Sequence, residues 1–437
     1  MLGLYYNRLF NKYILQYKTH KLNYFIKEII LMKIYKNTNQ FLLVLYIILY
    51  PILPTYGKYN SDIILYSLIL LNIIGFIFIE KERINVRHHI KNIFKDKLFL
   101  SLLLLNFSMY LSAIVAINKK IAITNSIRFS FYVFIFYIIS YTLKNKKQIF
   151  NVINAFIVTA VISSIVSIYQ IFKLFSIDEP INSNNRIHSF LENSNNLGAY
   201  TILAIFILIM FIIKSEKKSF KIFFGFTTLL LLINIISSQS RNALIGLCIG
   251  IFLVAILYDK RFIILSIILP ILLFIIPQSR LRILEILDPS QNISRFKIWE
   301  AAKMMIKDNP IFGVGYENFQ VQYPIYVNNN PETLLYSEGY VALHPHNIFL
   351  KFQSELGILG TIAFILFISI AIITLIKLCI THTDKYISTI IIGITSGFIA
   401  FQCMNLIDNY YGAPKVLMTM FVVLGIANHY RLDWNNR

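Results

Sequence analysis

The sequence is poor in charged residues. Only 14% of its 437 residues are Asp, Glu, Lys or Arg, whereas soluble domains typically contain about 25%. The mean hydropathy is high, at +0.64. Apolar runs long enough to cross a bilayer, about 20 residues each, recur along the chain. The composition therefore argues against a soluble domain and predicts an all-α polytopic membrane protein.

Cysteine is also scarce. Cys248, Cys379 and Cys403 all lie within or beside apolar runs, and their spacing fits neither a disulfide framework nor a zinc site. A cleavable signal peptide is not evident, because the first long apolar run begins near Phe41 and lacks a small-residue cleavage pattern. The first 31 residues, basic and aromatic, predict a cytoplasmic or interfacial tail.

The net charge of +20 would suggest a nucleic-acid partner in a soluble protein. Here Lys and Arg cluster between alternate apolar runs, which predicts membrane topology and no nucleic-acid binding. We predict about twelve spans, at residues 41–56, 61–79, 98–117, 121–143, 149–175, 196–213, 220–237, 243–258, 262–276, 350–378, 386–407 and 414–429.

The basic loops fix the predicted orientation. They follow spans two, four, six and eight and occur in both tails, so both termini should be cytoplasmic; Lys119 and Lys120 are exceptions. The chain then divides into a basic tail (1–40), spans one to nine (41–276), a large external loop (277–349), spans ten to twelve (350–429) and a second tail (430–437).

The external loop is longer than a typical connection, which favours a functional role. Its segment SRFKIWEAAK predicts an amphipathic helix that begins near Ser294 and ends at Asp308-Asn309-Pro310. We expect its apolar face to carry Phe296, Trp299, Met305 and Ile306. Gly313-Val314-Gly315 is too short for a phosphate loop and predicts a turn after Pro310.

Three arginines on the predicted external side are candidate functional residues. Arg241 lies in SSQSRNALIG; it could snorkel to headgroups, but the neighbouring polar side chains favour a buried polar pocket. Arg295 opens the loop helix, where it opposes the helix dipole, although a solvated surface arginine would look the same. Arg186, in NSNNRIHSF, is most simply a loop decoration.

A histidine completes this set. His346, in HPHNIFLKFQSELGILG, has an ordinary pKa near neutrality and could accept a proton from a hydroxyl; a structural role is the alternative. His344-Pro345-His346 could suggest a metal site. No third ligand with convincing spacing accompanies the pair, so we predict no metal.

The run from His346-Asn347 through nine residues to Gly357-Ile358-Leu359-Gly360 resembles the H-N-x9-G-x-x-G signature of the O-antigen ligase superfamily. That superfamily also includes O-antigen and capsule polymerases. SQSRNALIG is similar to the short arginine turn of the family, SRFKIWEAAKMMIKDNPIFGVG to its loop helix, and NNRIHSFLENSNNLGAY to a weaker third segment. The resemblance covers roughly residues 180–430.

The resemblance implies a membrane glycosyltransferase of the GT-C kind in the bacterial inner membrane, without a cofactor. Its large loop and active site would be periplasmic. The donor would be a glycan on undecaprenyl pyrophosphate. A ligase passes this glycan to a sugar hydroxyl of the lipid A-core, and a polymerase passes it to another lipid-linked glycan.

Among individual residues, the resemblance implies that His346, Arg241 and Arg295 are essential, with Arg186 less secure. Asn347, Gly357 and Gly360 support the motif, the glycines as close-packing points. The R-x3-L pattern of the family fits Arg280 to Leu284, whereas Arg241 has Ile245 at that spacing. Which arginine the pattern describes therefore remains open.

These residues suggest a mechanism. Arg241 and Arg295, assisted by Arg186, would hold the pyrophosphate through paired hydrogen bonds, and His346 would act as general base in an inverting displacement. A DxD-like acidic pair is lacking, so metal independence is expected. A lipid-linked glycan transporter is a more distant alternative, but it predicts charges at mid-depth in several spans, and most spans here are uncharged.

Overall fold

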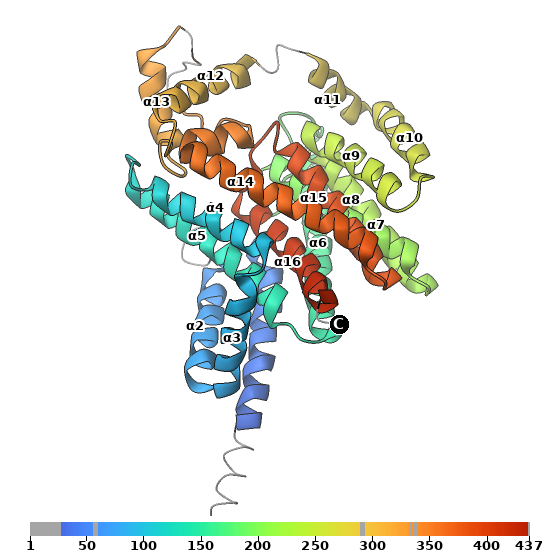
Figure 1. Ribbon diagram of the computed structural model, residues 1–437. Coiled ribbons are helices and arrows are strands. Elements are labelled where there is room, and N and C mark those ends of the chain that lie inside the picture. The colour runs from blue at the N-terminus through green and yellow to red at the C-terminus, as the bar shows by residue number, and fades with distance from the viewer. Residues whose placement is uncertain (1–27, 56–59, 289–292, 333, 335–339, 436–437) are drawn as a thin grey trace, which may run out of the picture.

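The computed structural model describes residues 28–55, 60–288, 293–332, 334 and 340–435. Within these residues the only regular elements are helices (Figure 1). A first helix covers residues 28–52. The others are α2 (Asp62–Phe78), α3 (Glu80–Ile93), α4 (Lys97–Ser112), α5 (Lys119–Tyr137), the π-helical η1 (Ile138–Thr142), α6 (Lys146–Phe175), α7 (Ser194–Lys214), α8 (Lys218–Ser237), α9 (Arg241–Leu257), α10 (Phe262–Ile275), α11 (Pro277–Leu287), α12 (Ile293–Asp308), α13 (Phe319–Asn329), α14 (Ile348–Thr381), α15 (Lys385–Met404), the 3-10 turn η3 (Tyr410–Gly412) and α16 (Pro414–Asn435).

The predicted spans all overlap helices. Six helices, α5 with η1, α6, α7, α8, α14 and α15, are long and apolar enough to cross a membrane, and up to eight spans result if each bent helix pair is one span. Helices α4 and α9 are apolar but shorter. The all-helical, multi-pass character is therefore confirmed, whereas the count of twelve remains a prediction.

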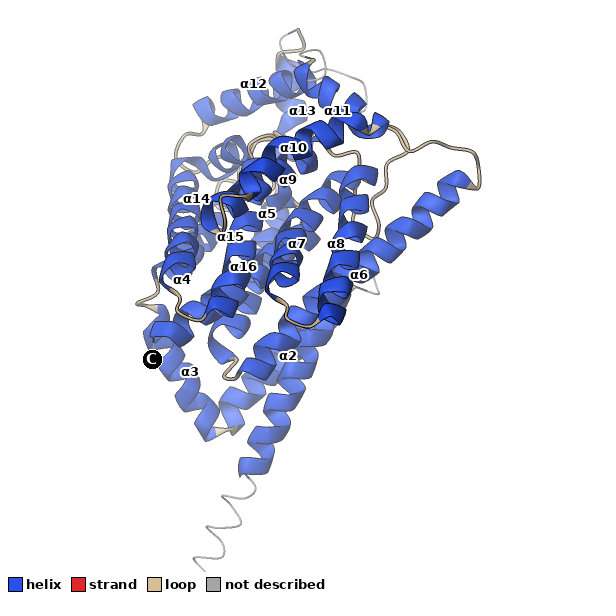
Figure 2. Cartoon of the chain, turned by 90° about the vertical axis from the view of Figure 1, so that its right-hand side faces the viewer, coloured by secondary structure: helices blue, strands red, loops and turns tan. Residues whose placement is uncertain are grey.

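The basic segment after the second predicted span is a helix rather than a loop. Helix α3 turns by 108° from α2 and lies beside it at the end of the molecule where the chain also terminates (Figure 1). Asp96 then caps α4 by accepting a hydrogen bond from the Leu98 amide. This end of the molecule is far from the loop helices α11 to α13 in both views (Figure 2).

The central helices pack closely because small residues face neighbouring backbone. Helix α15 lies against α7 and α9. A side chain at Gly393 of α15 would meet the Phe206 carbonyl of α7 at 2.7 Å, and one at Gly397 would meet the Ile202 carbonyl at 3.0 Å. Close backbone approach of this kind stabilises helix pairs in membranes. It fixes the start of α7 and the loop after α15, which both contribute to the site described below.

The predicted loop helix is confirmed as α12, which ends at Asp308. Its buried face, however, differs from the prediction. Ile298, Ala301, Ala302 and Met305 point inward and share a small core with residues of α13, while Phe296 is 50% exposed. The inward residues follow the i, i+3, i+4 spacing of one helix face. Of the four expected residues, Met305 is fully buried, Trp299 and Ile306 are half-buried, and Phe296 is exposed.

Candidate functional site

Asn347 places the start of α14 beside the loop that follows α15. Its side-chain oxygen accepts a hydrogen bond from the Leu350 amide at 3.0 Å and thereby caps the helix. Its amide nitrogen donates to the Leu406 carbonyl at 2.9 Å, and the Ile348 amide donates to the Asn405 carbonyl at 3.0 Å. This double attachment brings His346 next to the residues that follow Leu406.

Gly357 interrupts α14 ten residues after this cap. Its φ of 64° and ψ of −162° lie in a region that is essentially restricted to glycine. A side chain there would also lie 2.2 Å from the Ile311 carbonyl oxygen, and one at Gly360 would meet Leu356 Cβ at 2.1 Å. Both glycines are thus close-packing points, and Gly357 in addition supplies a backbone conformation that other residues avoid.

The break in α14 receives the turn at residues 310–315. The Val314 amide donates to the Ser354 carbonyl at 2.8 Å, and the Ile358 amide donates to the Pro310 carbonyl at 2.9 Å. The predicted turn after Pro310 is therefore confirmed. Two segments of the sequence that resemble the same family, the loop helix with its NPIFGVG end and the glycine motif, are joined backbone to backbone.

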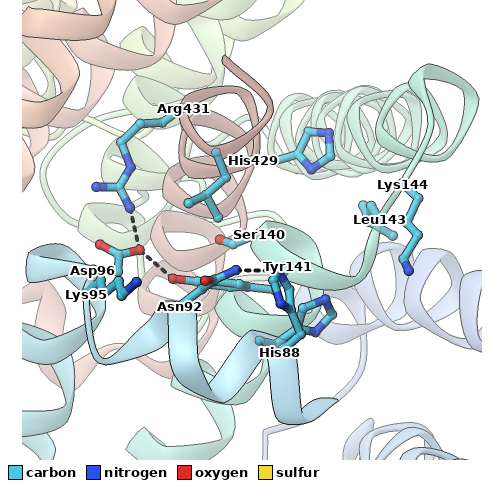
Figure 3. Close-up of a pocket in the computed structure, with 12 residues that line it drawn as sticks. His88, Asn92, Lys95, Asp96, Ser140, Tyr141, Leu143, Lys144, His429 and Arg431 are labelled. Carbon is cyan, nitrogen blue, oxygen red and sulfur yellow. Dashed lines mark hydrogen bonds and ion pairs between the residues drawn. The ribbon is translucent and has the colours of Figure 1, made fainter. Parts of the chain in front are cut away.

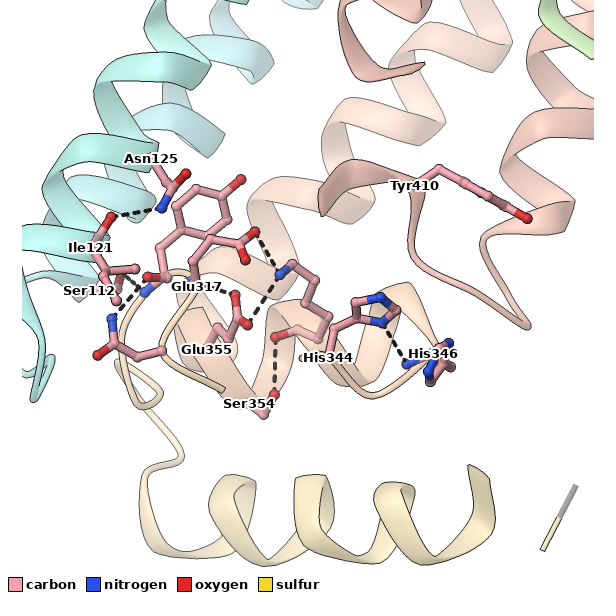
Figure 4. Close-up of polar contacts among 12 residues, drawn as sticks. Ser112, Ile121, Asn125, Glu317, His344, His346, Ser354, Glu355 and Tyr410 are labelled. Carbon is pink, nitrogen blue, oxygen red and sulfur yellow. Dashed lines mark hydrogen bonds and ion pairs between the residues drawn. The ribbon is translucent and has the colours of Figure 1, made fainter. Parts of the chain in front are cut away.

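A buried charged group reinforces this junction. Lys351 of α14 is fully buried and contacts Glu317 at 2.8 Å and Glu355 at 3.2 Å. The Glu317 amide also donates to Glu355 at 2.8 Å; Figure 4 shows the two glutamates pointing toward one another. Removing Lys351 would leave two neighbouring carboxylates without a cation, which is strongly destabilising. The group therefore fixes the loop on α14.

The turn between α4 and α5 also binds the segment at residues 316–318. The Tyr316 amide donates to the Ser112 hydroxyl at 2.9 Å, and the Asn118 amide donates to the Asn318 side chain at 2.8 Å. These two hydrogen bonds fix the segment that follows α12 relative to α4 and α5.

His346 and Asp408 form a hydrogen-bonded pair. His346 Nδ1 lies 3.0 Å from an Asp408 carboxylate oxygen, with the histidine side chain 32% exposed and the aspartate 7% exposed. Burial raises the pKa of Asp408, but the hydrogen bond and charge of His346 outweigh it and hold that pKa at about 2. Asp408 is therefore an anion that accepts the Nδ1 proton, leaving Nε2 of His346 as the basic nitrogen.

His344 contacts the His346–Asp408 pair through His346. Its Nδ1 accepts a hydrogen bond from the His346 amide at 3.3 Å, and the two rings meet edge to face at 4.3 Å. Burial, followed by His346, lowers the pKa of His344 to about 3, so the ring is neutral. His346 itself has a φ of 49°, a left-handed conformation that the His344 contact supports and that is common at functional sites.

Arg186 is connected to the same aspartate through Asn195. The Asn195 side chain donates to Asp408 at 3.2 Å and accepts a hydrogen bond from the Arg186 guanidinium. The Nε of Arg186 donates to the Ser238 carbonyl at 2.9 Å. Burial, followed by the charge of Arg282, lowers the pKa of Arg186 to about 10. Arg186 is thus built into the site rather than decorating a loop.

The short turn before α9 is a buried polar structure. Ser238, Gln239 and Ser240 are nearly inaccessible to solvent, which supports the polar-pocket interpretation over snorkelling. The Gln239 carbonyl accepts a hydrogen bond from Arg282 of α11 at 2.8 Å. Because Arg186 binds the preceding carbonyl, two guanidinium groups from different segments meet on this turn.

Arg241 extends the positive charge toward the loop helix. It donates to the Glu285 backbone carbonyl at 3.1 Å. Burial, followed by the charges of Arg295 and Arg282, lowers the pKa of Arg241. The charge of Arg295 also acts on His344, so Arg295 lies within electrostatic range of both the arginines and the histidines.

We call Arg186, Arg241, Arg282 and Arg295 the arginine cluster. Arg282 pairs with Glu285, whereas the other three form no ion pair with any residue that the structure describes. Uncompensated guanidinium groups gathered at half-buried positions favour an anionic ligand, above all one with phosphate oxygens. The arrangement can therefore hold a phosphate beside a histidine base.

Sequence reasoning missed several members of this site. Asp408 lies 62 residues from His346, in the short segment before the last predicted span. Asn195 lies in a segment singled out only for Arg186. Arg282 is two residues from Arg280, the residue that fits the R-x3-L pattern; Arg280 is exposed. An acidic residue in an otherwise apolar border segment was the available signal for Asp408.

The fold also supplies the third metal ligand that the sequence did not reveal. His344, His346 and Asp408 offer ligand atoms that lie within 4.8 Å of one another. The Nδ1 atoms of both histidines already take part in hydrogen bonds, one to Asp408 and one to a backbone amide. These hydrogen bonds fix the orientation of the His346 ring through Nδ1 and leave the Nε2 atoms of both histidines without a hydrogen-bond partner among the described residues.

Comparison with known families agrees with this geometry. Residues 226–365 match the family model described as O-Antigen ligase. The matched region contains Arg241, Arg295, His346 and both motif glycines, while Arg186 and Asp408 lie outside it. The match supports the O-antigen ligase superfamily that the sequence motifs resemble. No curated protein matches the chain.

Proposed function

With an O-antigen ligase match at residues 226–365 as the premise, we propose that this protein is an O-antigen ligase. It transfers a glycan from undecaprenyl pyrophosphate to a sugar hydroxyl of the lipid A-core. The observation that carries the proposal is the His346–Asp408 pair together with an arginine cluster of which three members form no ion pair with any described residue. A base and an anion site side by side are what glycan transfer from a pyrophosphate carrier requires.

The arginine cluster is the proposed donor site. As the bond between the anomeric carbon and the phosphate oxygen breaks, negative charge develops on the leaving pyrophosphate. Arg241 and Arg295 bind this charge, with Arg186 assisting. Fixed charges in a partly dry site stabilise such a transition state without reorganisation and commonly supply the largest catalytic effect. The attachment of Arg186 to a backbone carbonyl and to Asn195 supports this fixed position.

His346 is the proposed general base. Its Nε2 takes the proton of the acceptor hydroxyl while the hydroxyl oxygen forms the new bond to the anomeric carbon. The pyrophosphate leaves with the bonding electrons, and the configuration at that carbon inverts. Asp408 keeps the ring in the tautomer that leaves Nε2 free and stabilises the imidazolium that forms, as an aspartate does in hydrolase triads. Proton transfer of this kind contributes roughly 10²–10⁴-fold.

The proposal includes a location. The protein would be a GT-C-like inner-membrane enzyme of about twelve spans, with both termini cytoplasmic and the site on the periplasmic face. The large loop 277–349 would lie between spans nine and ten and carry Arg295 to the site. The basic residues concentrated at the opposite end, on α3 and near the terminus, support this orientation.

Polymerisation of lipid-linked repeat units, as in O-antigen or capsule synthesis, is the second candidate, because it uses the same donor chemistry. A gene deletion followed by lipopolysaccharide analysis separates the two. Loss of all long glycan from the lipid A-core, with polymer retained on the carrier lipid, supports ligation. A core that bears a single repeat unit supports polymerisation and contradicts the ligase assignment. Loss of all glycan from the lipid A-core, with unpolymerised repeat units trapped on the inner leaflet, would support a transporter.

A further inference from the structure

A second polar hollow lies at the end of the molecule opposite the candidate site. It has a volume of about 550 Å³ and opens between α3, η1 and the end of α16. Figure 3 shows residues of all three elements, among them His88, Ser140 and Arg431, around it. We call it the basal pocket; its charged lining consists of Lys95, Asp96, Lys144 and Arg431, with His88, His89 and His429 beside them.

The one carboxylate among the residues that line the basal pocket already binds neighbouring side chains. Asp96 forms an ion pair with Arg431 and accepts a hydrogen bond from the Tyr141 hydroxyl at 2.6 Å. Its other oxygen caps α4. The positive charges of Lys95 and Lys144 therefore remain without a carboxylate among the described lining residues, and Lys144 is steered by the Asn85 side chain at 3.1 Å. The pocket as a whole favours an anion.

The position of α3 connects this anion site with a membrane surface. Helix α3 carries Lys81, Arg83, Arg87 and Lys91. Ile84 and Ile90 on the same helix are 58% and 46% exposed, and Phe94 just beyond it is 69% exposed. A basic helix with exposed apolar residues lies in the interface of a bilayer. The mouth of the basal pocket would then open at the level of the lipid headgroups.

The far side of α3 offers space for an alkyl chain. A hollow of about 520 Å³ between α2, α3, α4 and α5 is lined mainly by apolar side chains, including Phe76, Ile90, Ile93 and Leu103. Tyr137 lines this hollow and bonds through its hydroxyl to His89 of the basal pocket at 3.1 Å. A lipid offers both a charged head and an apolar chain, whereas a soluble phosphate offers only the charge.

We propose that the basal pocket binds the phosphate headgroup of an anionic phospholipid. Lys95 and Lys144 contact the phosphate, and the Asp96–Arg431–Tyr141 group fixes the floor beneath it. Basic pockets between membrane helices on the cytoplasmic side recognise anionic headgroups in this way. Because α3, η1 and α16 all line the pocket, the lipid joins the N-terminal helices to the C-terminal one and stabilises the folded state.

The test uses the full-length protein in a neutral detergent. It is titrated with dioctanoyl phosphatidylglycerol, and first-lipid binding is followed by native mass spectrometry together with the melting temperature. The double variant Lys95→Gln/Lys144→Gln should weaken binding about tenfold or more, in line with the contribution of two basic residues near a charged surface. Its melting temperature without lipid should equal that of the wild type.

The matched control is Arg87→Gln/Lys91→Gln, which removes the same charge from the exposed side of α3, where neither residue lines the pocket. It should change the affinity less than twofold. An equal loss in both double variants would show a diffuse charge effect and overturn the proposal. Dioctanoyl phosphatidylcholine or inorganic pyrophosphate binding as tightly as phosphatidylglycerol would overturn it as well.

Discussion

Two buried carboxylates, Asp96 and Asp408, lie at opposite ends of the molecule and are held in different ways. Asp96 accepts hydrogen bonds from the Leu98 amide and the Tyr141 hydroxyl and pairs with Arg431. All its partners have fixed protonation at neutral pH, and none can exchange a proton with a substrate. Asp96 therefore holds α4, η1 and α16 together and has no chemistry to perform.

Asp408 is held as firmly, but its main partner can react. His346 contacts it through Nδ1 and is one third exposed, and its Nε2 has no hydrogen-bond partner among the residues that the structure describes. The surroundings differ as well, since Arg186, which reaches Asp408 through Asn195, forms no ion pair with the residues that the structure describes. A buried carboxylate indicates a reactive site when it orients a titratable group that faces solvent, and a structural one when it is saturated by fixed donors.

The largest effect is expected from the reactive partner itself. His346→Ala should lower glycan transfer about 10²–10⁴-fold, because the proton acceptor is lost. Transfer is measured with purified enzyme and lipid-linked donor, and the melting temperature serves as the control for folding. Full transfer activity in a normally folded variant would contradict the general-base assignment.

The next prediction compares the effects on activity and stability of removing the charge of Asp408 and of Asp96. Asp408→Asn should lower transfer about tenfold to a thousandfold, because the amide no longer fixes the histidine tautomer. Asp96→Asn should lower the melting temperature and leave the turnover of the folded enzyme near the wild-type value. The comparison fails if both variants lose activity to the same extent relative to their folded fraction.

A smaller loss of transfer activity is expected when the guanidinium of Arg241 is replaced by an ammonium group. Arg241→Lys keeps the charge but loses the planar pair of donors, so transfer should fall about 10–100-fold. The matched control is Arg280→Lys, because Arg280 is exposed and fits the R-x3-L pattern; its activity should be unchanged. The opposite result would assign the family arginine to position 280.

His344 should contribute a modest dependence of the stability on pH. The folded-state pKa of about 3 for His344 lies below the ordinary value near 6.5. Between these values the unfolded chain binds a proton that the folded protein does not, so stability falls as the pH decreases from about 6.5 toward 3. The melting temperature of wild type should therefore drop over this range, and His344→Asn should drop less. His88→Asn, on the opposite face, should follow the wild type.

The smallest effect is expected from metal removal. Because the proposed mechanism uses Nε2 of His346 as a base, and a metal ion on that atom would block it, dialysis against a chelator should leave transfer activity unchanged. Loss of activity that returns on addition of a divalent cation would convert the His346–Asp408 pair from an oriented base into a metal site.

Much of this molecule was predictable because its signals are local. Each predicted apolar range coincides with a helix, since hydropathy requires no knowledge of neighbouring segments. Helix α12 ends at Asp308 as predicted, because Pro310 stops a helix wherever it occurs. His346, Arg241 and Arg295 were predicted from segments that resemble family motifs, and their roles stay predictions. The buried face of α12 was only partly predicted, because burial depends on which element covers the helix.

The sequence by itself thus determined the apolar helices, the end of α12 and the residue types available for chemistry. Only the tertiary structure decided that Asp408 orients His346 across 62 positions and that Asn195 joins Arg186 to the same carboxylate across 213 positions. It also decided that the 310–315 turn enters the break at Gly357. Hydrogen bonds and ion pairs depend on distance in space, and a chain that folds back on itself sets those distances through packing that no local pattern contains.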